Sequence, residues 1–390
     1  MNKYLNQLSV FATVVVLAVS AGAETVVDVT GTGIQKISVA VQVSNPAFAK
    51  CLSRNLEISG LFSVGQGGAI RVTGVPGAIR AEGNGRVVPM TTPFADDKSA
   101  RMAARQLADA MCQTYSNGQQ PGFASDRVLF LNRGRAKGKG TARPSELCVG
   151  YADGWDIRQL TSDAKMTIFP RWKSDGSSIY YISDKNGAPQ IWEMNTLSGQ
   201  RRTRWSFKGT PTGIAVSPDG SRVAAVLSFQ GNPELYILEG ERYIRLTNTP
   251  FASEGQPTWS PDGRQIAFVS DETRQPQIYV IDVATRKKRR LTTRGVQNID
   301  PDWGADGRIT YITRRAGAQV AVMSADRGDS ASTVLDAPGV WEHPSWAKDK
   351  RHVVASSNGK LFILDTLENG DKPRQMFSAN GNWISPTWMK

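Results

Sequence analysis

A short sequence phrase recurs along this chain at a nearly constant interval. In its clearest copy the phrase runs Pro257-Thr-Trp259-Ser-Pro-Asp262-Gly263, and the positions equivalent to Trp259 are 172, 216, 259, 303, 346 and 388. Repeats of about 40–50 residues are typical of β-propeller blades, because each unit buries its apolar faces only against its neighbours. The sequence therefore predicts a mainly β protein built as a propeller.

Each copy of the phrase is followed by further strand patterns. After Trp259, the apolar runs Gln265–Asp271 and Gln277–Asp282 predict a second and a third strand, and the short basic run Lys288–Thr292 predicts a fourth. The Asp-Gly pair after the first strand suits a tight turn, since Asp bonds nearby backbone and Gly accepts a positive φ. Four strands in each repeat agree with a propeller blade.

The two ends of the repeat region decide the number of blades. The chain ends at Lys390, two residues after Trp388, so the last repeat contains only its first strand. Strand patterns without a preceding phrase occur earlier, at Arg127–Leu131, Glu146–Val149 and Asp156–Thr161. We therefore expect the C-terminal strand to complete a blade that begins near residue 127. This arrangement gives six blades and covers strand edges that would otherwise be open.

Residues 24–120 follow a different pattern and predict a small α/β domain in front of a propeller of residues 121–390. One helix is expected to begin at Asn45-Pro46 and to end at Gly60, and a second is expected over Asp97–Tyr115. The strand candidates are Lys36–Val43, Ala69–Val72 and Arg86–Met90.

The first 23 residues have the pattern of a cleavable signal peptide. Lys3 provides a basic start, residues 10–19 are apolar, and Ala21-Gly22-Ala23 suits cleavage. The apolar run is shorter than the roughly 20 residues that cross a bilayer, which makes an uncleaved anchor the weaker alternative. We expect an exported chain that begins at Glu24.

Cysteines and charge constrain the chemistry less sharply. Cys51 and Cys112 lie on predicted helices and could form a disulfide, but burial of all three thiols, with Cys148, is an equal alternative. The formal net charge is +12, and the basic run Arg286–Arg290 falls on a predicted outer strand. Because an exported chain does not meet nucleic acid as its usual partner, we interpret these charges as a solvated rim.

Catalytic motifs are scarce. The chain has two histidines, His343 and His352, and it contains neither a Gly-x-Ser-x-Gly nucleophile motif nor a Walker phosphate loop. Aspartates such as Asp262 recur at the turn of successive repeats, which favours a structural role. No Cys-x-x-Cys spacing suggests a zinc site. We therefore predict no catalytic residues, no metal site and no cofactor.

The loops that enter the innermost strands are expected to meet at the mouth of the central channel. They carry a mixed polar set with one aromatic side chain, which suits a protein partner better than a small apolar ligand. These predicted mouth residues are Thr210, Thr212, Glu254, Gln256, Asn298, Asp300, Glu342, His343, Asn382 and Trp383.

Several segments together resemble the TolB family of the periplasmic Tol-Pal system. The segment Leu52-Ser-Arg-Asn-Leu56-Glu-Ile-Ser-Gly60-Leu-Phe62 resembles the family's first helix and its exit. Gly122-Phe123-Ala-Ser-Asp-Arg127-Val resembles the junction into the propeller, and Glu146-Leu-Cys-Val-Gly-Tyr-Ala-Asp153-Gly154 resembles the opening blade. The chain departs from the family in a glycine-rich stretch at residues 65–93 and in Val216, which replaces the tryptophan of the second phrase.

The resemblance implies a non-enzymatic periplasmic scaffold, expected as a monomer, that supports outer-membrane integrity and envelope constriction at cell division. It implies that the lipoprotein Pal binds at the propeller mouth and that the C-terminal domain of TolA binds an N-terminal strand by β-strand addition. In this chain that strand would consist of Glu24, Thr25, Val26, Val27, Asp28 and Val29.

Two alternatives from other functional classes stay open. One is an exported propeller enzyme, a lyase or hydrolase acting on an acidic polymer, which would require acids beside a His or Tyr at hydrogen-bonding distance in the mouth. The other is a secreted binding module for anionic glycans, which would require a continuous basic groove.

Overall fold

A computed structural model of the chain describes residues 35–135, 143–229, 231–314, 317–335, 337, 339–367, 372–377 and 380–389. All of them belong to one compact unit, Gly33–Lys390. The predicted signal peptide at residues 1–23 and the predicted N-terminal strand Glu24–Val29 lie outside the described residues.

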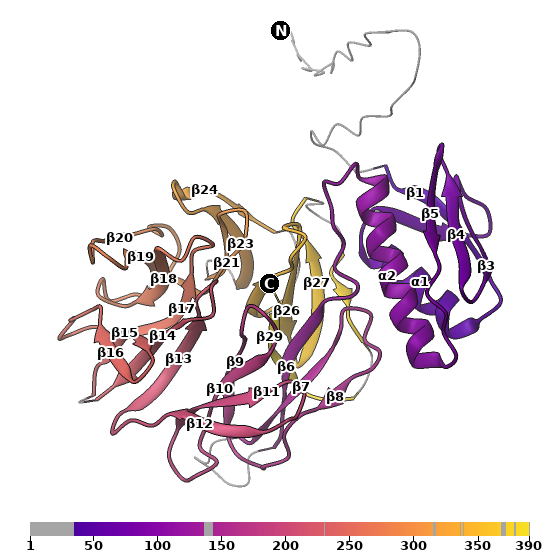
Figure 1. The fold of residues 1–390 in the computed structure, drawn as a ribbon. Helices are drawn as coiled ribbons and strands as arrows, with labels where there is room; N and C mark the ends of the chain where they lie inside the picture. The colour runs from indigo at the N-terminus through magenta and orange to yellow at the C-terminus, as the bar shows by residue number, and fades with distance from the viewer. Residues whose placement is uncertain are drawn as a thin grey trace, which may run out of the picture. The chain divides into compact units, whose positions relative to one another are not determined.

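The first part of this unit is a five-stranded sheet covered by two helices (Figure 1). The strand order is β2-β1-β3-β4-β5, with β1 parallel to both of its neighbours and the rest antiparallel. The strands are β1 (Ile37–Val43), β2 (Phe62–Gly65), β3 (Ile70–Val75), β4 (Ala78–Gly83) and β5 (Arg86–Met90), and the helices are α1 (Pro46–Ile58) and α2 (Asp97–Tyr115). The apolar sides of the helices and the sheet share one core that includes Phe48, Leu52 and Leu107.

Local chemistry fixes the helix ends as the sequence indicates. The Asn45 side chain accepts a hydrogen bond from the Phe48 N–H (2.9 Å), and proline follows at the first helical position. Beyond the end of α1, Gly60 has a φ of +71°, which glycine adopts without strain. At α2, the Asp96 and Ser99 side chains cap each other's backbone N–H groups.

Two strands of this sheet, β2 and β4, were not predicted from the sequence. Glycine weakens strand propensity, and this stretch is rich in it. The structure shows what two of these glycines permit. A Cβ atom at Gly74 would lie 2.1 Å from the Ala78 carbonyl oxygen, and one at Gly83 would lie 2.0 Å from that of Ala69. The backbones of β3 and β4 therefore approach more closely than side chains would allow.

The rest of the unit is a six-bladed β-propeller, and the prediction that the C-terminal strand closes it is confirmed. Blade one holds β9 (Thr167–Trp172), β10 (Ser178–Ser183), β11 (Gln190–Asn195) and β12 (Arg201–Trp205). Blade two holds β13 (Thr210–Val216), β14 (Arg222–Ser228), β15 (Pro233–Glu239) and β16 (Arg242–Arg245). Blade three holds β17 (Glu254–Trp259), β18 (Gln265–Ser270), β19 (Gln277–Asp282) and β20 (Lys288–Arg290).

The other three blades repeat the plan. Blade four holds β21 (Gln297–Trp303), β22 (Arg308–Arg314), β23 (Ala318–Ser324) and β24 (Gly328–Val334). Blade five holds β25 (Trp341–Trp346), β26 (His352–Ser357), β27 (Lys360–Asp365) and β28 (Arg374–Gln375). The closing blade joins the last strand β29 (Trp383–Trp388) to β6 (Arg127–Arg133), β7 (Ser145–Tyr151) and β8 (Arg158–Gln159).

The recurring tryptophans join neighbouring blades. Each is buried at the end of an innermost strand, and in three places an arginine from the preceding blade lies over its ring. The guanidinium carbons of Arg127, Arg222 and Arg308 lie 4.6, 4.8 and 4.7 Å from the ring centres of Trp172, Trp259 and Trp346. Cation–π contacts of this kind therefore link three pairs of neighbouring blades.

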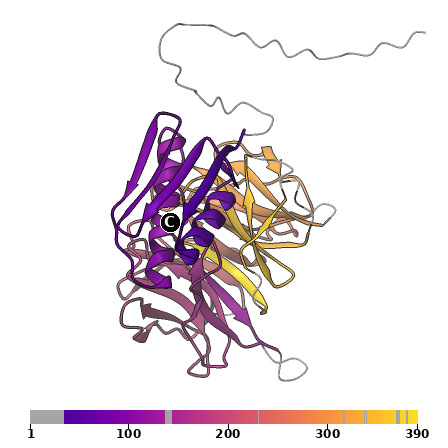
Figure 2. The ribbon, with the colours of Figure 1, turned by 90° about the vertical axis from the view of Figure 1, so that its right-hand side faces the viewer.

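The helices lie on the face of the sheet that is turned toward the propeller (Figures 1 and 2). The contact between the two parts is ionic and buried. Arg105 of α2 donates to both carboxylate oxygens of Asp153 in the closing blade, at 2.6 and 3.0 Å, and neither side chain is exposed. Its Nη1 atom lies 2.9 Å from Asp156, which also pairs with Arg101.

A second buried cluster lies beside residues 117–125, the linker that joins the first domain to the propeller. Arg351 pairs with Asp365 at 2.5 Å and donates to the Gln120 side chain at 3.0 Å. His352 lies between Asp349 and Asp365 and packs against Phe123 with ring centres 4.7 Å apart. The nearby carboxylates raise the pKa of His352 against the lowering effect of its burial.

All three cysteines are buried free thiols, so the disulfide between Cys51 and Cys112 that the sequence left open is not formed. The Cys51 Sγ atom instead donates to Asp153 at 3.3 Å, as part of the ionic contact between the two parts. Burial raises the pKa of this thiol. Neither helix within the described residues is long and apolar enough to cross a membrane.

The carboxylate of Asp126, directly before β6, predicts a specific pH dependence. Burial raises its pKa to about 7, and the neighbouring Asp109 adds to the shift. A raised pKa means that ionisation opposes folding increasingly as the pH rises from about 4 to 7. We therefore expect the difference in unfolding free energy between Asp126→Asn and the parent chain to increase by about 2–3 kcal/mol from pH 5 to pH 8, in favour of the variant. Urea unfolding of both chains at both pH values measures this change. An equal difference in unfolding free energy at the two pH values would contradict the prediction.

Candidate functional site: the central channel

Five of the six innermost strands contain the same backbone irregularity. In each, the strand pairing slips directly around the proline of the repeated phrase, which is the signature of a β-bulge. The residue before that proline has a positive φ of 48–54° in every case. These five residues, called here the left-handed ring, are Phe169, Gln256, Asp300, His343 and Ser385.

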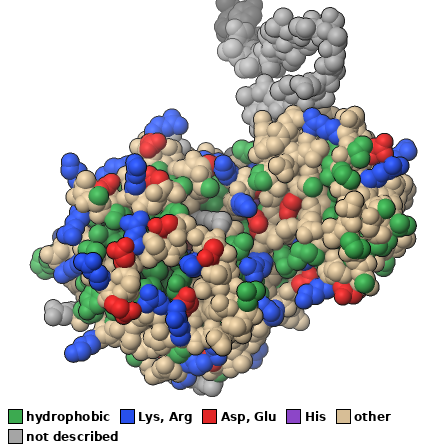
Figure 3. All heavy atoms as spheres, in the orientation of Figure 1, with side chains coloured by type: hydrophobic (Ala, Val, Ile, Leu, Met, Phe, Trp, Pro, Cys, Tyr) green, Lys and Arg blue, Asp and Glu red, His purple; other side chains and the backbone are tan. Residues whose placement is uncertain are grey.

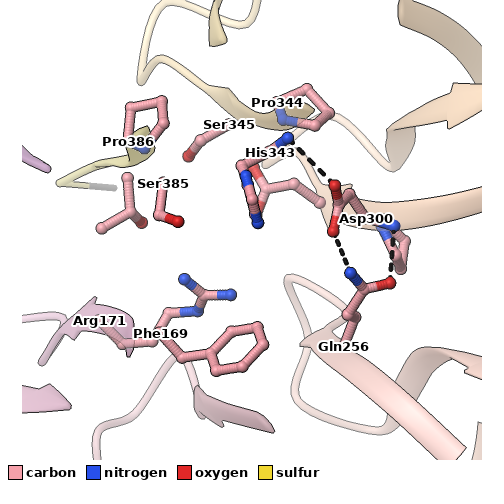
Figure 4. Close-up of a pocket in the computed structure, with 12 residues that line it drawn as sticks. Phe169, Arg171, Gln256, Asp300, His343, Pro344, Ser345, Ser385 and Pro386 are labelled. Carbon is pink, nitrogen blue, oxygen red and sulfur yellow. Dashed lines mark hydrogen bonds between the residues drawn. The ribbon is translucent and has the colours of Figure 1, made fainter. Parts of the chain in front are cut away.

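The left-handed ring lines the central channel (Figure 4). A positive φ costs a non-glycine residue about 1–2 kcal/mol, and such strain concentrates at functional sites. The free space among the lining side chains is about 30 Å³. Small-molecule sites usually occupy about 300–1,000 Å³, so this channel suits a side-chain tip from a macromolecule better than an entire small substrate.

Hydrogen bonds hold the ring in place. The Gln256 side chain donates to the Asp300 carboxylate, and its carbonyl oxygen accepts the Asp300 N–H at 3.0 Å. The other Asp300 oxygen accepts the backbone N–H of His343 at 3.1 Å. One level deeper, Thr258, Asp302 and Ser345 each accept the backbone N–H of the next blade's tryptophan at 2.8–3.2 Å. The channel wall is therefore continuous from blade three to the closing blade.

Blade two interrupts this wall. Its equivalent residues are Gly213, Ala215 and Val216, and none of the described lining residues comes from this blade. Arg171 of blade one extends into the channel, where its guanidinium points toward the space below His343 and Ser385 (Figure 4). Burial lowers the pKa of Arg171, and the carboxylates of Asp302 and Asp300 oppose that shift.

The site presents donors and acceptors rather than an assembled acid–base pair. The His343 Nδ1 atom is buried without a hydrogen-bond partner among the described residues. His343 donates to Asp300 through its backbone N–H and not through the imidazole ring. Within the described part of the chain, no cluster of three or more His, Cys, Asp or Glu side chains has the geometry to hold a metal ion.

Of the ten predicted mouth residues, Gln256, Asp300 and His343 line this channel. Glu254 and Asn298 are buried in the wall, where Glu254 accepts from Thr249 (2.9 Å) and Asn298 donates to Gln277 (2.8 Å). Trp383 is buried against Phe130. The remaining residues lie near the innermost strands with exposed or half-buried side chains: Thr210, Thr212, Glu342 and Asn382.

Three further residues line the channel that were not predicted from the sequence: Phe169, Arg171 and Ser385. Phe169 and Ser385 could have been found from their position in the repeat. Both stand directly before the proline of the phrase, as Gln256, Asp300 and His343 do. Arg171 precedes the tryptophan of its phrase, where most of the other blades carry small or acidic side chains.

A second, larger cleft of about 950 Å³ lies between α1 and the turn after β7. Lys50 and Arg54 line it from α1, and Trp155 and Phe377 line it from the propeller. The Lys50 amine lies 5.9 Å from the Trp155 ring centre. Neither histidine of the chain is among its described lining residues, and of its two carboxylates, Glu57 and Asp153, the second is bound by Arg105.

The family profile described as TolB beta propeller domain matches residues 117–390. The chain belongs to the TolB family. It is 26% identical over 297 residues to a protein TolB homolog from Chlorobium luteolum, covering 73% of this chain and 65% of that protein. It is 32% identical over 177 residues to the Tol-Pal system protein TolB from Anaeromyxobacter dehalogenans, covering 45% and 38%. The match thus spans less than two thirds of the length of either curated relative.

The solved structure of TolB from Acinetobacter baumannii has the same fold. It superposes with a TM-score of 0.79, covers 92% of this chain and 97% of its own, and is 23% identical in sequence. The likeness therefore confirms the expected architecture of a six-bladed propeller with a small α/β domain in front.

Proposed function

We propose that this TolB-family chain is a non-enzymatic periplasmic scaffold of the Tol-Pal system. In this proposal residues 1–23 are a cleaved signal peptide, residues 24–120 form the first domain and residues 121–390 form the propeller. Pal binds at the propeller mouth, and the C-terminal domain of TolA binds the strand Glu24–Val29. The complex supports outer-membrane integrity and constriction at division, and the chain acts as a monomer.

The left-handed ring is the observation that carries this proposal. Five strained residues with different side chains surround a narrow channel. Such an arrangement is expected of a surface that is preorganised to bind another molecule. Their polar groups, together with the guanidinium of Arg171, offer hydrogen bonds in fixed positions. A protein partner that inserts a loop would use such groups as its anchor points.

Two features of the channel favour a scaffold over the enzyme alternative. Its free space of about 30 Å³ is too small for a polymer segment without rearrangement of the wall. Both oxygens of the Asp300 carboxylate accept hydrogen bonds, from Gln256 and from the backbone N–H of His343, so Asp300 contacts His343 through the backbone and not as an acid–base pair with the imidazole.

Crosslinking in the periplasm followed by pull-down of the tagged full-length chain tests the proposal. We expect recovery of Pal and of TolA. A mature chain that lacks the segment Glu24–Val29 should still bind Pal but should no longer bind TolA. Recovery of neither protein from cells that contain both would contradict the proposal.

Removing strain from the ring should separate stability from binding. In His343→Gly the backbone keeps its bond to Asp300 but loses the left-handed strain, so we expect about 0.5–1 kcal/mol more unfolding free energy. Affinity for Pal should fall about tenfold, because the imidazole leaves the channel. Urea unfolding and calorimetric titration measure the two effects.

Asn84→Gly is the matched control for this variant. Asn84 has a φ of +51° in the exposed turn between β4 and β5, remote from the ring. Because asparagine tolerates a positive φ, the control should change stability little, and it should bind Pal as the parent chain does. Equal binding by His343→Gly and the parent would refute a role of the ring in partner recognition.

A further inference from the structure

The outermost strand of blade two differs in composition from the other basic edges of the propeller. β16 reads Arg242-Tyr243-Ile244-Arg245, and all four residues are exposed. It pairs with β15 on one side only, so one row of its backbone groups faces outward. The outer strand of blade three, in contrast, is the wholly basic Lys288–Arg290. Charged edges discourage strand pairing, whereas β16 places an aromatic and an aliphatic side chain between its charges.

One face of β16 carries an exposed aromatic cluster. The Tyr243 ring stacks on Phe229, with ring centres 6.2 Å apart, and both rings contact Phe207 edge-on at 6.2 and 6.5 Å. Tyr243 and Phe229 are 57% and 39% exposed. Tyrosine and phenylalanine gathered in this way provide large contact areas at low entropic cost, as in protein interfaces.

The opposite face of β16 borders a groove between blades two and three. Ile244, Ile237 and Val283 supply its apolar surface, and the volume of the groove is about 460 Å³. The cations Arg222 and Arg286 line it together with Asp219 and Glu239. The Asp219 carboxylate is already bound by the side chains of Ser217 and Ser221, while the Arg286 guanidinium stands on an exposed turn.

We propose that β16 is a docking edge for a short extended segment of a partner protein that carries acidic and apolar side chains. This site is separate from the central channel and goes beyond the scaffold function proposed above. A strand added to β16 would bond its outward backbone groups. Successive side chains of the added strand would point to opposite faces of the sheet, so that they would contact the aromatic cluster on one face and the groove on the other.

Charge decides which occupant the edge accepts. If two copies of the chain paired through β16 in antiparallel fashion, Arg242 of one would face Arg245 of the other, and like charges directly opposite each other destabilise a sheet. A segment with acidic residues at those positions would form opposite-charge pairs instead. Lys and Arg side chains line the outer border of the propeller, with acidic and hydrophobic side chains among them (Figure 3), and the net charge of +12 adds long-range attraction for an acidic segment.

Fluorescence anisotropy with a labelled, capped peptide tests the proposal on the full-length chain. The probe Gly-Glu-Phe-Val-Glu-Gly places glutamates opposite Arg242 and Arg245. We expect saturable binding that is lost when the probe is N-methylated at Phe and Val, because the backbone donors are then removed. We also expect binding at least tenfold weaker for the probe Gly-Lys-Phe-Val-Lys-Gly.

A double variant separates edge docking from simple attraction between charges. Tyr243→Lys with Ile244→Lys makes β16 wholly basic, like Lys288–Arg290. Edge docking predicts at least tenfold weaker binding of the acidic probe despite two added positive charges. The control Arg158→Glu, on the exposed outer strand β8, should bind as the parent does. Unchanged circular dichroism and melting temperature confirm that each variant folds.

Several outcomes would overturn the proposal. Tighter binding of the acidic probe by the double variant would show that charge alone acts. Equal binding of the N-methylated probe would exclude strand addition. A dimer in analytical ultracentrifugation that the double variant abolishes would identify a second copy as the occupant. Binding to phosphatidylglycerol vesicles that depends on Tyr243, without binding of the peptide, would identify a membrane surface instead.

Discussion

Removal of residues 383–390 is expected to abolish cooperative folding of the propeller. These residues supply β29, which pairs with β6 and buries Trp383 and Trp388. Loss of two buried tryptophans alone costs about 6–10 kcal/mol, which is comparable with the whole stability of an ordinary domain. The truncated chain should lose its sharp urea transition and bind a hydrophobic dye, because the buried apolar strand β6 becomes an open edge.

Addition of a synthetic peptide of residues 380–390 is the control for this truncation. Because β29 is joined to the rest of its blade only through hydrogen bonds and packing, the peptide should restore the urea transition in proportion to its concentration. A truncated chain that unfolds at the same urea concentration as the parent would show that ring closure contributes little to stability.

The repeat spacing predicted the architecture because it is a property of the whole chain. A period of 42 to 44 residues, with one strand at the C-terminus and three unpaired strand patterns near residue 127, leaves few arrangements other than six blades. The bounds of α2 were also predicted, because its apolar stripe is a local signal. Strands β2 and β4 were missed because the stretch is rich in glycine, and Gly74 and Gly83 serve a close approach of β3 and β4 that only the folded sheet reveals.

The channel wall was predicted only in part for a related reason. Alternation along a strand predicts which side chains face inward, and a β-bulge breaks that alternation by one residue. The bulge turns Phe169 and Ser385 into the channel, and the sequence shows the adjacent proline but not the positive φ. Gln256, Asp300 and His343 were identified because they are polar, which is a weaker criterion than their backbone conformation.

The buried ionic contact lay beyond sequence reasoning altogether. An arginine on an amphipathic helix normally indicates a solvated face, and Arg105 stands outside the apolar stripe that predicts α2. Its partner Asp153 is 48 residues away in another part of the chain. Nothing in either local pattern shows that the two side chains meet where no solvent reaches.

Arg105→Met should therefore destabilise the chain strongly. The substitution leaves Asp153 buried with its charge uncompensated and removes the guanidinium that lies 3.8 Å from the Tyr151 ring centre. Breaking a buried ion pair on one side costs about 3–5 kcal/mol. Urea unfolding should show this loss, and limited proteolysis should cut the linker between residues 117 and 125 faster than in the parent, because the first domain no longer docks firmly.

Two further variants make the interpretation of Arg105→Met specific. Arg80 pairs with Glu82 on the exposed surface, with side-chain exposures of 65% and 57%, so Arg80→Met should leave the urea midpoint nearly unchanged. Combining Arg105→Met with Asp153→Asn removes the orphaned charge and keeps an acceptor for the Asn55 amide, which donates to Asp153 at 3.0 Å. The double variant should regain at least half of the lost stability. If it is no more stable than Arg105→Met, the cost arises from lost packing of the arginine stem and not from the buried charge.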